Sequence, residues 1–199
     1  MTIIAEHTLL KGPAGTGKTF WARQQASLLD MKNTAYEADT AIRRIYSAAM
    51  RDYSPVSLRA PFRAPHHTVS VIGLTGALRD GYAWQPGELS LAHGGVLFLD
   101  ELAEFSARAL EEIVRALTHG YVALSSVKGT VIHAPATFRL VAAVNLCPCG
   151  WQGTLRPCTC TTSQVKAYEA RYAVIRPFFR NVLGPDEYRM TELARPVQE

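Results

Sequence analysis

The stretch LLKGPAGTGKTF, residues 9–20, constrains the fold of this chain more than any other part of the sequence. Gly12, Gly17, Lys18 and Thr19 fit the pattern G-x-x-x-x-G-K-[ST], whose glycines let the backbone wrap closely around phosphate oxygens. The apolar residues before the loop predict a short buried strand, and residues 18–29 predict a helix. The alternative is a glycine-rich turn that matches by chance, but the flanking strand and helix favour a P-loop.

We expect the backbone and side chains of this loop to bind ATP. The predicted cofactor contacts come from Gly12, Pro13, Ala14, Gly15, Thr16, Gly17, Lys18, Thr19 and Phe20. Lys18 would reach the β and γ phosphates, and the Thr19 hydroxyl would ligate Mg²⁺.

The segment GGVLFLDE, residues 94–101, predicts a second strand of the same sheet. Its four apolar residues are typical of a strand buried on both faces, and Asp100 and Glu101 follow at its carboxyl end, where open α/β sheets bind ligands. Asp100 would hold Mg²⁺, and Glu101 would polarise an attacking water as general base. An acidic start to the following helix also explains both residues, and the two interpretations are compatible.

A third strand, FRLVAAVN at residues 138–145, ends in Asn145. Its amide would orient the same water or contact the γ phosphate. A turn-forming role is the alternative, because asparagine is common where strands end.

The remaining pattern predicts strands alternating with helices, hence an α/β fold with a mostly parallel sheet covered on both faces. We expect a helix at 37–53, an extended connection or edge strand at 54–68, a loop-bearing insertion at 68–95, a helix between Ser106 and Gly120, and a hairpin at 121–135.

Composition limits the class of protein. A chain of 199 residues that is 48% hydrophobic and 19% charged is typical of one globular domain. Neither a signal peptide nor a membrane span is recognisable, so we expect a cytoplasmic protein with no membrane partner. The net charge of +4 is a weak indication of polyanionic partners.

All four cysteines lie in one short segment. Cys147, Cys149, Cys158 and Cys160 form C-x-C, eight residues, then C-x-C, and four thiolates would complete a tetrahedral structural Zn²⁺ site. Reduced free thiols, or disulfides formed in air, are the alternative. We favour zinc, in a structural role that leaves no ligand position open for water.

Two other groups of residues have structural explanations. His66 and His67 would point to opposite faces of an extended segment, so we do not expect a shared metal. The basic residues would follow DNA phosphates, although a solvated helix face or ion pairs explain them equally well. These are Arg43, Arg44, Arg51, Arg59 and Arg63.

Several longer blocks resemble the AAA+ core of the magnesium-chelatase-like YifB/ComM ATPases. They are FRAPHHT, QPGELSLAHGGVLFLDELAEFSARAL, FRLVAAVN followed by CPCG, and CTC before SQVKAYEARY, so that the resemblance covers roughly residues 8–172. It implies a three-layer P-loop NTPase with a helix-2-type insertion and a β-hairpin before the sensor strand. It also implies a homo-oligomeric ring, usually a hexamer, with ATP at the subunit interfaces and Asn145 as the γ-phosphate sensor.

In related proteins the insertion loop and the hairpin face the ring pore, and for ComM-type members the partner is DNA. The resemblance does not imply insertion of magnesium into a porphyrin. It indicates a short form, without the domain that usually precedes the core and without the helical lid, so we expect one core over 1–199 with a divergent segment at 173–199. Arg180 and Arg189 are the candidates for the arginine that reaches a neighbouring subunit's ATP.

These observations predict an ATPase that depends on Mg²⁺ and remodels or translocates DNA or a DNA-bound partner. The alternative is a nucleotide-binding regulatory or interaction module that hydrolyses ATP slowly or not at all. A small-molecule kinase is a third and weaker hypothesis.

Overall fold

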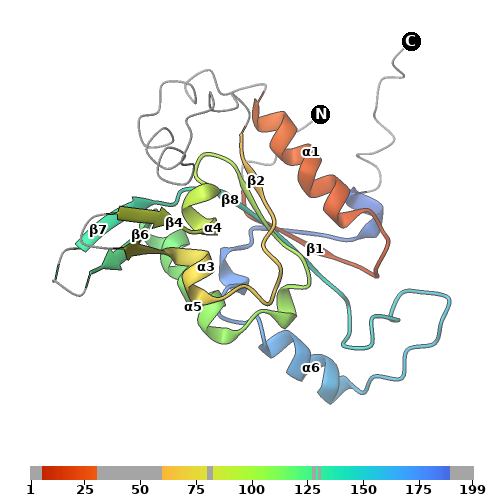
Figure 1. Cartoon of the computed structure of the whole chain (residues 1–199). Coiled ribbons are helices and arrows are strands. Elements are labelled where there is room, and N and C mark those ends of the chain that lie inside the picture. Colours follow the sequence, from red (N-terminus) through yellow and green to blue (C-terminus); the bar gives the residue numbers. More distant parts are fainter. Residues whose placement is uncertain (1–5, 31–59, 80–82, 127–128, 130, 189–199) are drawn as a thin grey trace, which may run out of the picture.

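A computed structural model describes residues 6–30, 60–79, 83–126, 129 and 131–188 (Figure 1). The predicted helix at 37–53 lies outside the described residues, as do Arg43, Arg44, Arg51, Arg59 and Arg189.

The centre of the molecule is a sheet of five parallel strands in the order β2-β5-β8-β1-β9. Its strands are β1 (Thr8–Lys11), β2 (Phe62–Arg63), β5 (Val96–Leu99), β8 (Arg139–Val144) and β9 (Asn181–Leu183). The three predicted strands are confirmed, and β2 is the edge strand expected in the proline-rich connection. Because the strands are parallel, β1, β5 and β8 end at the same edge of the sheet.

Alternate residues of the central strands pack on opposite faces, as a sheet buried on both sides requires. On β5, Leu97 and Leu99 belong to one apolar cluster, whereas Val96 and Phe98 belong to another. Helix α1 (Lys18–Asp30) covers the second cluster with Trp21. Helices α5 (Ala107–His119) and α6 (Thr162–Ala170) cover the first (Figure 1). The three-layer α/β fold class is therefore confirmed.

Helix α5 begins and ends where the sequence predicts. The Ser106 hydroxyl accepts a hydrogen bond from the backbone of Ala109, and Gly120 ends the helix in the left-handed conformation. Leu110 and Ile113 are fully buried.

The predicted insertion contains more regular structure than its glycines suggest. Between β2 and β5 lie α3 (Val71–Thr75), β3 (Gly76–Arg79), β4 (Ala83–Pro86) and α4 (Glu88–Leu91), and β3 pairs antiparallel with β4. The predicted second hairpin is confirmed as β6 (Tyr121–Ser125) and β7 (Val131–Pro135). The two hairpins lie side by side at one end of the molecule (Figure 1).

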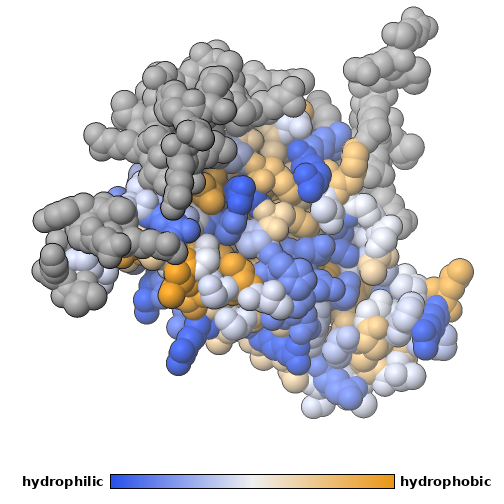
Figure 2. Space-filling model, viewed as in Figure 1, coloured by the Kyte–Doolittle hydropathy of each residue, from blue (hydrophilic) through white to orange (hydrophobic). Residues whose placement is uncertain are grey.

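The segment after the last predicted motif adds two elements, the short helix η3 (Arg176–Phe178) and β9, which pairs with β1. A further short helix, η2 (Leu102–Glu104), follows β5. The surface in Figure 2 is mixed. The lobe at the lower right is formed by α6 and the cysteine loop, residues 145–161, and carries hydrophilic and hydrophobic groups side by side. No helix among the described residues is long and apolar enough to cross a membrane.

Candidate nucleotide-binding site

The glycine-rich loop lies between β1 and α1, at the edge where β5 and β8 also end. The backbone N–H of Gly12 donates to the carbonyl of Val144, 3.1 Å away, which joins the loop to the end of β8. A Cβ atom at Gly12 would lie 2.5 Å from the Tyr188 hydroxyl oxygen, so this position has no room for a side chain.

Lys18 is buried at the start of α1, with 8% of its surface exposed. Its ammonium donates to the carbonyls of Gly12 at 2.8 Å and Pro13 at 2.7 Å. Burial lowers the pKa of Lys18 from its usual value, while the charges on Asp100 and Glu101 oppose that shift. The ammonium thus lies beneath the loop, close to two carboxylates.

Asp100 follows β5 and faces the first turn of α1. One of its carboxylate oxygens lies 3.5 Å from the Thr19 hydroxyl, and the other accepts a hydrogen bond from the backbone N–H of Glu101 at 3.0 Å. The arrangement leaves a hydroxyl and a carboxylate side by side, which are ligand types that Mg²⁺ prefers.

Glu101 has an unusual backbone. Its φ of 51° and ψ of 49° lie in the left-handed region, and among the described residues it is the one non-glycine with positive φ. Such a conformation costs of order 1–3 kcal/mol and occurs mainly at functional sites. It turns the carboxylate, more than half exposed, away from the direction of the strand.

His67 contacts Glu101, a contact that the sequence did not reveal. Its Nδ1 lies 3.3 Å from a carboxylate oxygen of Glu101, and its ring lies 4.0 Å, between centroids, from that of His66. The prediction that the two histidines face apart was therefore wrong. The chain turns here, with the Val69 N–H bonded to the His66 carbonyl, so the alternation of an extended strand does not apply.

These elements surround a cavity of about 370 Å³. Its lining consists of residues 14–20, Asp100, Glu101 and Asn145. Of the predicted nucleotide contacts, Gly12 and Pro13 lie beneath this lining, where their carbonyls accept from Lys18.

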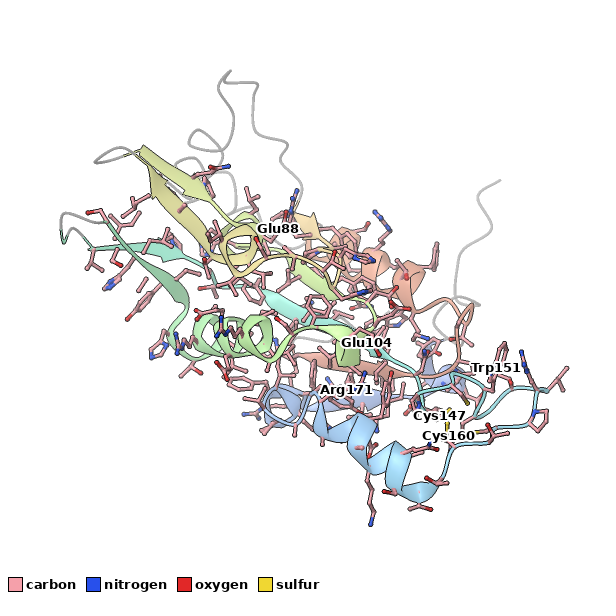
Figure 3. The ribbon with its side chains drawn as sticks, turned by 60° about the horizontal axis from the view of Figure 1, so that its bottom comes forward. Glu88, Glu104, Cys147, Trp151, Cys160 and Arg171 are labelled. Carbon is pink, nitrogen blue, oxygen red and sulfur yellow. The ribbon has the colours of Figure 1, made fainter. Side chains whose placement is uncertain are left out.

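Asn145 follows β8, and its backbone is hydrogen-bonded to the Tyr168 hydroxyl of α6. Burial raises the pKa of Tyr168 to about 12, although this hydrogen bond opposes the shift. Arg171, just after α6, donates to Glu104 of η2 at 3.2 Å (Figure 3). Helix α6 is thereby fastened to the segments that follow both β8 and β5.

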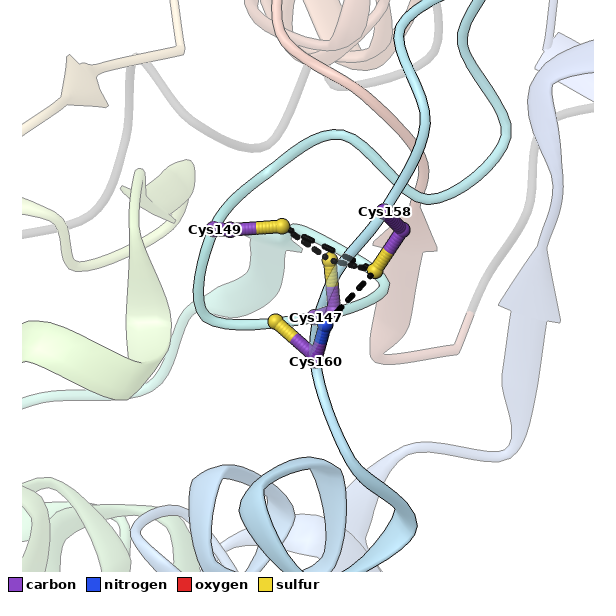
Figure 4. Close-up of side chains that lie close together, drawn as sticks. All are labelled: Cys147, Cys149, Cys158 and Cys160. Carbon is purple, nitrogen blue, oxygen red and sulfur yellow. Dashed lines mark hydrogen bonds between the residues drawn. The ribbon is translucent and has the colours of Figure 1, made fainter.

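The four cysteines gather on the loop between β8 and α6 (Figures 3 and 4). All four sulfurs lie within 4.8 Å of one another. Cys147 is 3.4 Å from Cys149 and 3.6 Å from Cys158, and Cys149 is 3.7 Å from Cys158. A disulfide would bring two sulfurs to about 2.0 Å, whereas four sulfurs bound to a tetrahedral zinc at about 2.3 Å lie about 3.8 Å apart. The cluster has the spacing of a metal site.

Backbone groups of the loop also suit thiolate ligands. The N–H of Gln152 lies 3.4 Å from the sulfur of Cys147, and that of Cys160 lies 3.5 Å from the sulfur of Cys158. Hydrogen bonds from the backbone of Trp151 and from the neighbouring thiols lower the pKa of the Cys149 thiol to about 6, whereas contacts within the same cluster raise the pKa of the Cys158 and Cys160 thiols.

The arginine candidates lie away from this cavity or outside the described residues. Arg180 immediately precedes β9, which pairs parallel with β1, so it lies at the amino ends of the strands, whereas the P-loop lies at their carboxyl ends. Its side chain is 77% exposed and 4.0 Å from Glu6. Arg189 lies outside the described residues. Arg63 of β2 donates to both carboxylate oxygens of Glu88, at 2.7 and 2.6 Å, so it forms an ion pair within the chain.

A contact from the end of the described chain reaches the P-loop. The Thr16 hydroxyl donates to the Pro13 carbonyl at 2.8 Å and lies 2.6 Å from the hydroxyl of Tyr188, which is 1% exposed. Since Thr16 uses its one hydrogen on Pro13, the Tyr188 hydroxyl donates to Thr16.

Comparison with known proteins gives consistent results. The sequence profile described as "Magnesium chelatase, subunit ChlI" matches residues 1–179. The protein YifB of Escherichia coli K12 is 40% identical over 153 residues, which are 76% of this chain and 29% of YifB. The competence protein ComM of Haemophilus influenzae is 40% identical over 154 residues, 75% of this chain and 29% of ComM. The chain spans about a third of the length of the relatives it matches.

Among solved structures, the crystal structure of NtrX from Brucella abortus superimposes with a TM-score of 0.54. The sequence identity is 18%, and the match covers 92% of this chain and 33% of NtrX. At this identity the likeness concerns the fold alone.

Proposed function

Because this chain belongs to the magnesium chelatase subunit ChlI family and has the AAA+ core that it shares with YifB and ComM, we propose that it is a Mg²⁺-dependent ATPase. The observation that carries the proposal is the single cavity lined by the P-loop, Asp100, Glu101 and Asn145. Three chain segments that are distant in sequence supply to it the groups that phosphoryl transfer needs.

The residues of the cavity take distinct roles in this proposal. Lys18 leaves the carbonyls of Gly12 and Pro13 to bind the β and γ phosphates, for which the loop N–H groups provide further donors. Thr19 and Asp100 hold Mg²⁺ between them. When bound, Mg²⁺ supplies positive charge that offsets the negative charge of the phosphate oxygens.

Glu101 acts as the general base on the attacking water. Its carboxylate lines the cavity and does not accept the backbone hydrogen bond that Asp100 accepts. One of its oxygens lies 3.3 Å from Nδ1 of His67, and the other would take the proton in this proposal. Asn145 follows β8, the strand beside β5, and its amide orients the water or the γ phosphate.

Turnover in this proposal requires an arginine from a second copy of the chain, in a ring that is usually a hexamer in proteins of this type. No arginine lines the described cavity, and Arg180 lies at the amino ends of the strands, away from the cavity at their carboxyl ends. A residue that serves a neighbour's nucleotide has to lie away from its own, and Arg180 meets that condition. Arg189 is the second candidate.

We propose DNA, or a partner bound to DNA, as the material that ATP hydrolysis moves. The support is the resemblance to ComM, together with the two hairpins, β3–β4 and β6–β7, that project side by side from the core (Figure 1).

The alternative is a nucleotide-binding regulatory module with little turnover. One observation favours it: the described lining of the cavity contains Lys18, Thr19 and Asp100, the side chains predicted to bind phosphate and Mg²⁺, but no arginine. Without assembly into a ring, such a site would bind ATP and release product very slowly.

We further propose Zn²⁺ as a structural cofactor of the four cysteines, supported by their four sulfurs lying within 4.8 Å of one another. Metal analysis of protein purified under reducing conditions should find about one zinc per chain. Reduced protein without zinc would leave free thiols as the correct interpretation.

Steady-state ATP hydrolysis across a range of protein concentrations, with and without single-stranded DNA, distinguishes the two functions. The ATPase proposal predicts a rate that rises more than proportionally with protein and increases when DNA is added. Saturable ATP binding without turnover under every condition would support the regulatory module.

A further inference from the structure

The four cysteines bring the two ends of the cysteine loop together. Cys147 lies two residues after Asn145, and Cys160 immediately precedes Thr161, the residue that caps α6. Cys147 is fully buried, whereas residues 151–159 are all exposed. The outer part of the loop therefore has no apolar core of its own. Hydrogen bonds of Thr154 and the contact of Arg156 with the Trp151 ring lie within this outer part, and the cysteine cluster joins its two ends.

The loop packs against the predicted phosphate site. A Cβ atom at Gly150 would lie 3.7 Å from the side-chain amide nitrogen of Asn145. A Cβ atom at Gly153 would lie 3.2 Å from the side chain of Leu146 and 3.9 Å from Cγ of Pro13. The backbone of the loop thus borders the sensor amide on one side and the P-loop on the other.

Gly150 is suited to this place by its backbone. Its φ of 76° is in the left-handed region, which glycine adopts without cost, and it lets the chain turn between Cys149 and the outer loop. The N–H of Gly150 donates to the carbonyl of Cys147 at 3.1 Å, which completes the turn that brings the first two sulfurs together.

The far end of the loop returns to the same residue. Thr161 and Gln164 form a reciprocal capping box at the start of α6. Seven residues after Thr161 the Tyr168 hydroxyl meets the backbone of Asn145, and Arg171 donates to Glu104, which lies beyond β5. The chain therefore leaves Asn145, passes through the cysteine loop and returns to the backbone of Asn145 at Tyr168. The four sulfurs lie together where the two ends of the loop meet.

We propose that one Zn²⁺ bound by these four thiolates holds the loop against Asn145 and Pro13. The affinity of the nucleotide site for ATP then depends on zinc, although zinc does not contact that site. The inference rests on the proposed nucleotide site and extends it. Zinc cross-links residues that are 13 positions apart at most, from 147 to 160, and so restricts the conformational freedom of the exposed segment between them. Without zinc, Asn145 and the neighbouring loop become ordered only when ATP binds, and the entropy that they lose weakens the binding.

The first experiment measures metal and nucleotide in the same samples. Reduced wild-type protein is treated with a chelator, and its zinc content and its equilibrium Kd for a fluorescent ATP analogue with Mg²⁺ are compared before treatment, after treatment and after zinc is added back. We expect about one zinc per chain before treatment and a Kd that rises about tenfold when it is removed, because several side chains then become ordered only on binding. Adding zinc should restore the original Kd.

Two variants extend the test. Cys160→Ser should lose zinc and show the weaker Kd even when zinc is supplied, while circular dichroism checks that the fold is retained. Leu155→Ala changes a fully exposed side chain of the same loop and should keep both zinc and the original Kd. Binding of Co²⁺ to metal-free wild-type protein, followed by the thiolate absorption of a tetrahedral site, provides a readout that does not involve nucleotide.

The outcomes separate this inference from the proposed function. An equal Kd with and without zinc, in protein that does bind zinc, overturns the coupling and leaves the nucleotide site intact. Reduced protein that binds neither Zn²⁺ nor Co²⁺ overturns the metal site. Zinc-loaded protein that binds no ATP analogue overturns the proposed function, and the coupling with it.

Discussion

Glu101 shows how single residues shape the candidate site. Its left-handed backbone turns the carboxylate into the cavity, and the same turn lets the Glu101 N–H fix the neighbouring carboxylate of Asp100. Two adjacent acids therefore have different surroundings, one held by a hydrogen bond and one in contact with His67. Their proposed division of work, metal ligand and base, follows from that difference.

The contact with His67 leads to a prediction for turnover. Replacing His67 by alanine removes the side chain that limits where the Glu101 carboxylate can lie, so we expect kcat to fall by roughly tenfold to a hundredfold. The KM for ATP should change little, since His67 does not line the cavity. His67→Gln, which keeps a donor toward Glu101, should recover part of the loss. An unchanged kcat in His67→Ala would show that Glu101 is positioned without it.

Lys18 gives a prediction for binding. Lys18→Ala removes the one lysine in the described cavity, and we expect the protein to lose measurable ATP binding while it remains folded. Lys166→Ala, a substitution on the exposed part of α6, is the matched control and should bind normally. Isothermal titration with ATP and Mg²⁺ measures both. Binding by Lys18→Ala with the affinity of the parent would exclude the P-loop as the phosphate site.

For single residues, the sequence predicts a place in the site when that place depends only on the position of the residue along one strand, helix or loop. Asp100 and Asn145 come directly after a strand and Lys18 begins α1, and parallel pairing then brings them together. His67 was misjudged because its direction depends on a turn that no local pattern marks. The buried contact of Tyr188 with the P-loop was missed because it joins residues that are 172 positions apart.

Helix α5 packs Leu110 and Ile113 against one face of the sheet, so its ends contribute to the stability of the core. Ser106→Ala removes the side-chain acceptor at its start and should lower the free energy of unfolding by about 1 kcal/mol. Ser106→Asp preserves an acceptor and should be close to the parent. Urea unfolding followed by circular dichroism measures the three proteins, and equal stability of all three would mean that water replaces the cap.

The short segment after β9 packs on the P-loop through Tyr188. Tyr188→Phe keeps the buried ring but removes the hydroxyl that donates to Thr16, so we expect a loss of about 1 kcal/mol in the free energy of unfolding. Tyr121→Phe changes a half-buried tyrosine on the distant hairpin and serves as the control. If Tyr188→Phe is as stable as the control, Tyr188 contributes through its ring alone.

Elements with a strong local period were predictable, and those defined by distant pairing were not. Helix α5 has its cap, its apolar stripe and its final glycine within one stretch of sequence. Strand β9 is three residues long and exists because β1 offers it a free edge, and the β3–β4 hairpin is interrupted by glycines and a proline. Neither has the alternation or length from which a strand is recognised.

At the scale of the whole molecule, parallel pairing turns separate motifs into one site. The central strands bring the P-loop, the two carboxylates and Asn145 to one edge of the sheet, and the cysteine loop folds back over that edge from the end of β8. Arg180 lies at the amino ends of the strands, on the other side of the sheet's length from this site. This division is what a ring of identical chains requires, although the ring itself and the extent of the core over 1–199 remain predictions.

The central claim is that Glu101 completes an ATPase site, and the most direct test compares the parent with Glu101→Gln. Bound ATP and released phosphate are measured in the same reaction, with zinc-loaded protein at concentrations that favour assembly. We predict that both proteins bind ATP with similar affinity, and that the parent releases phosphate at least about a hundredfold faster than the variant. Equal phosphate release by the two proteins, or ATP bound by the parent without any release, would contradict the account.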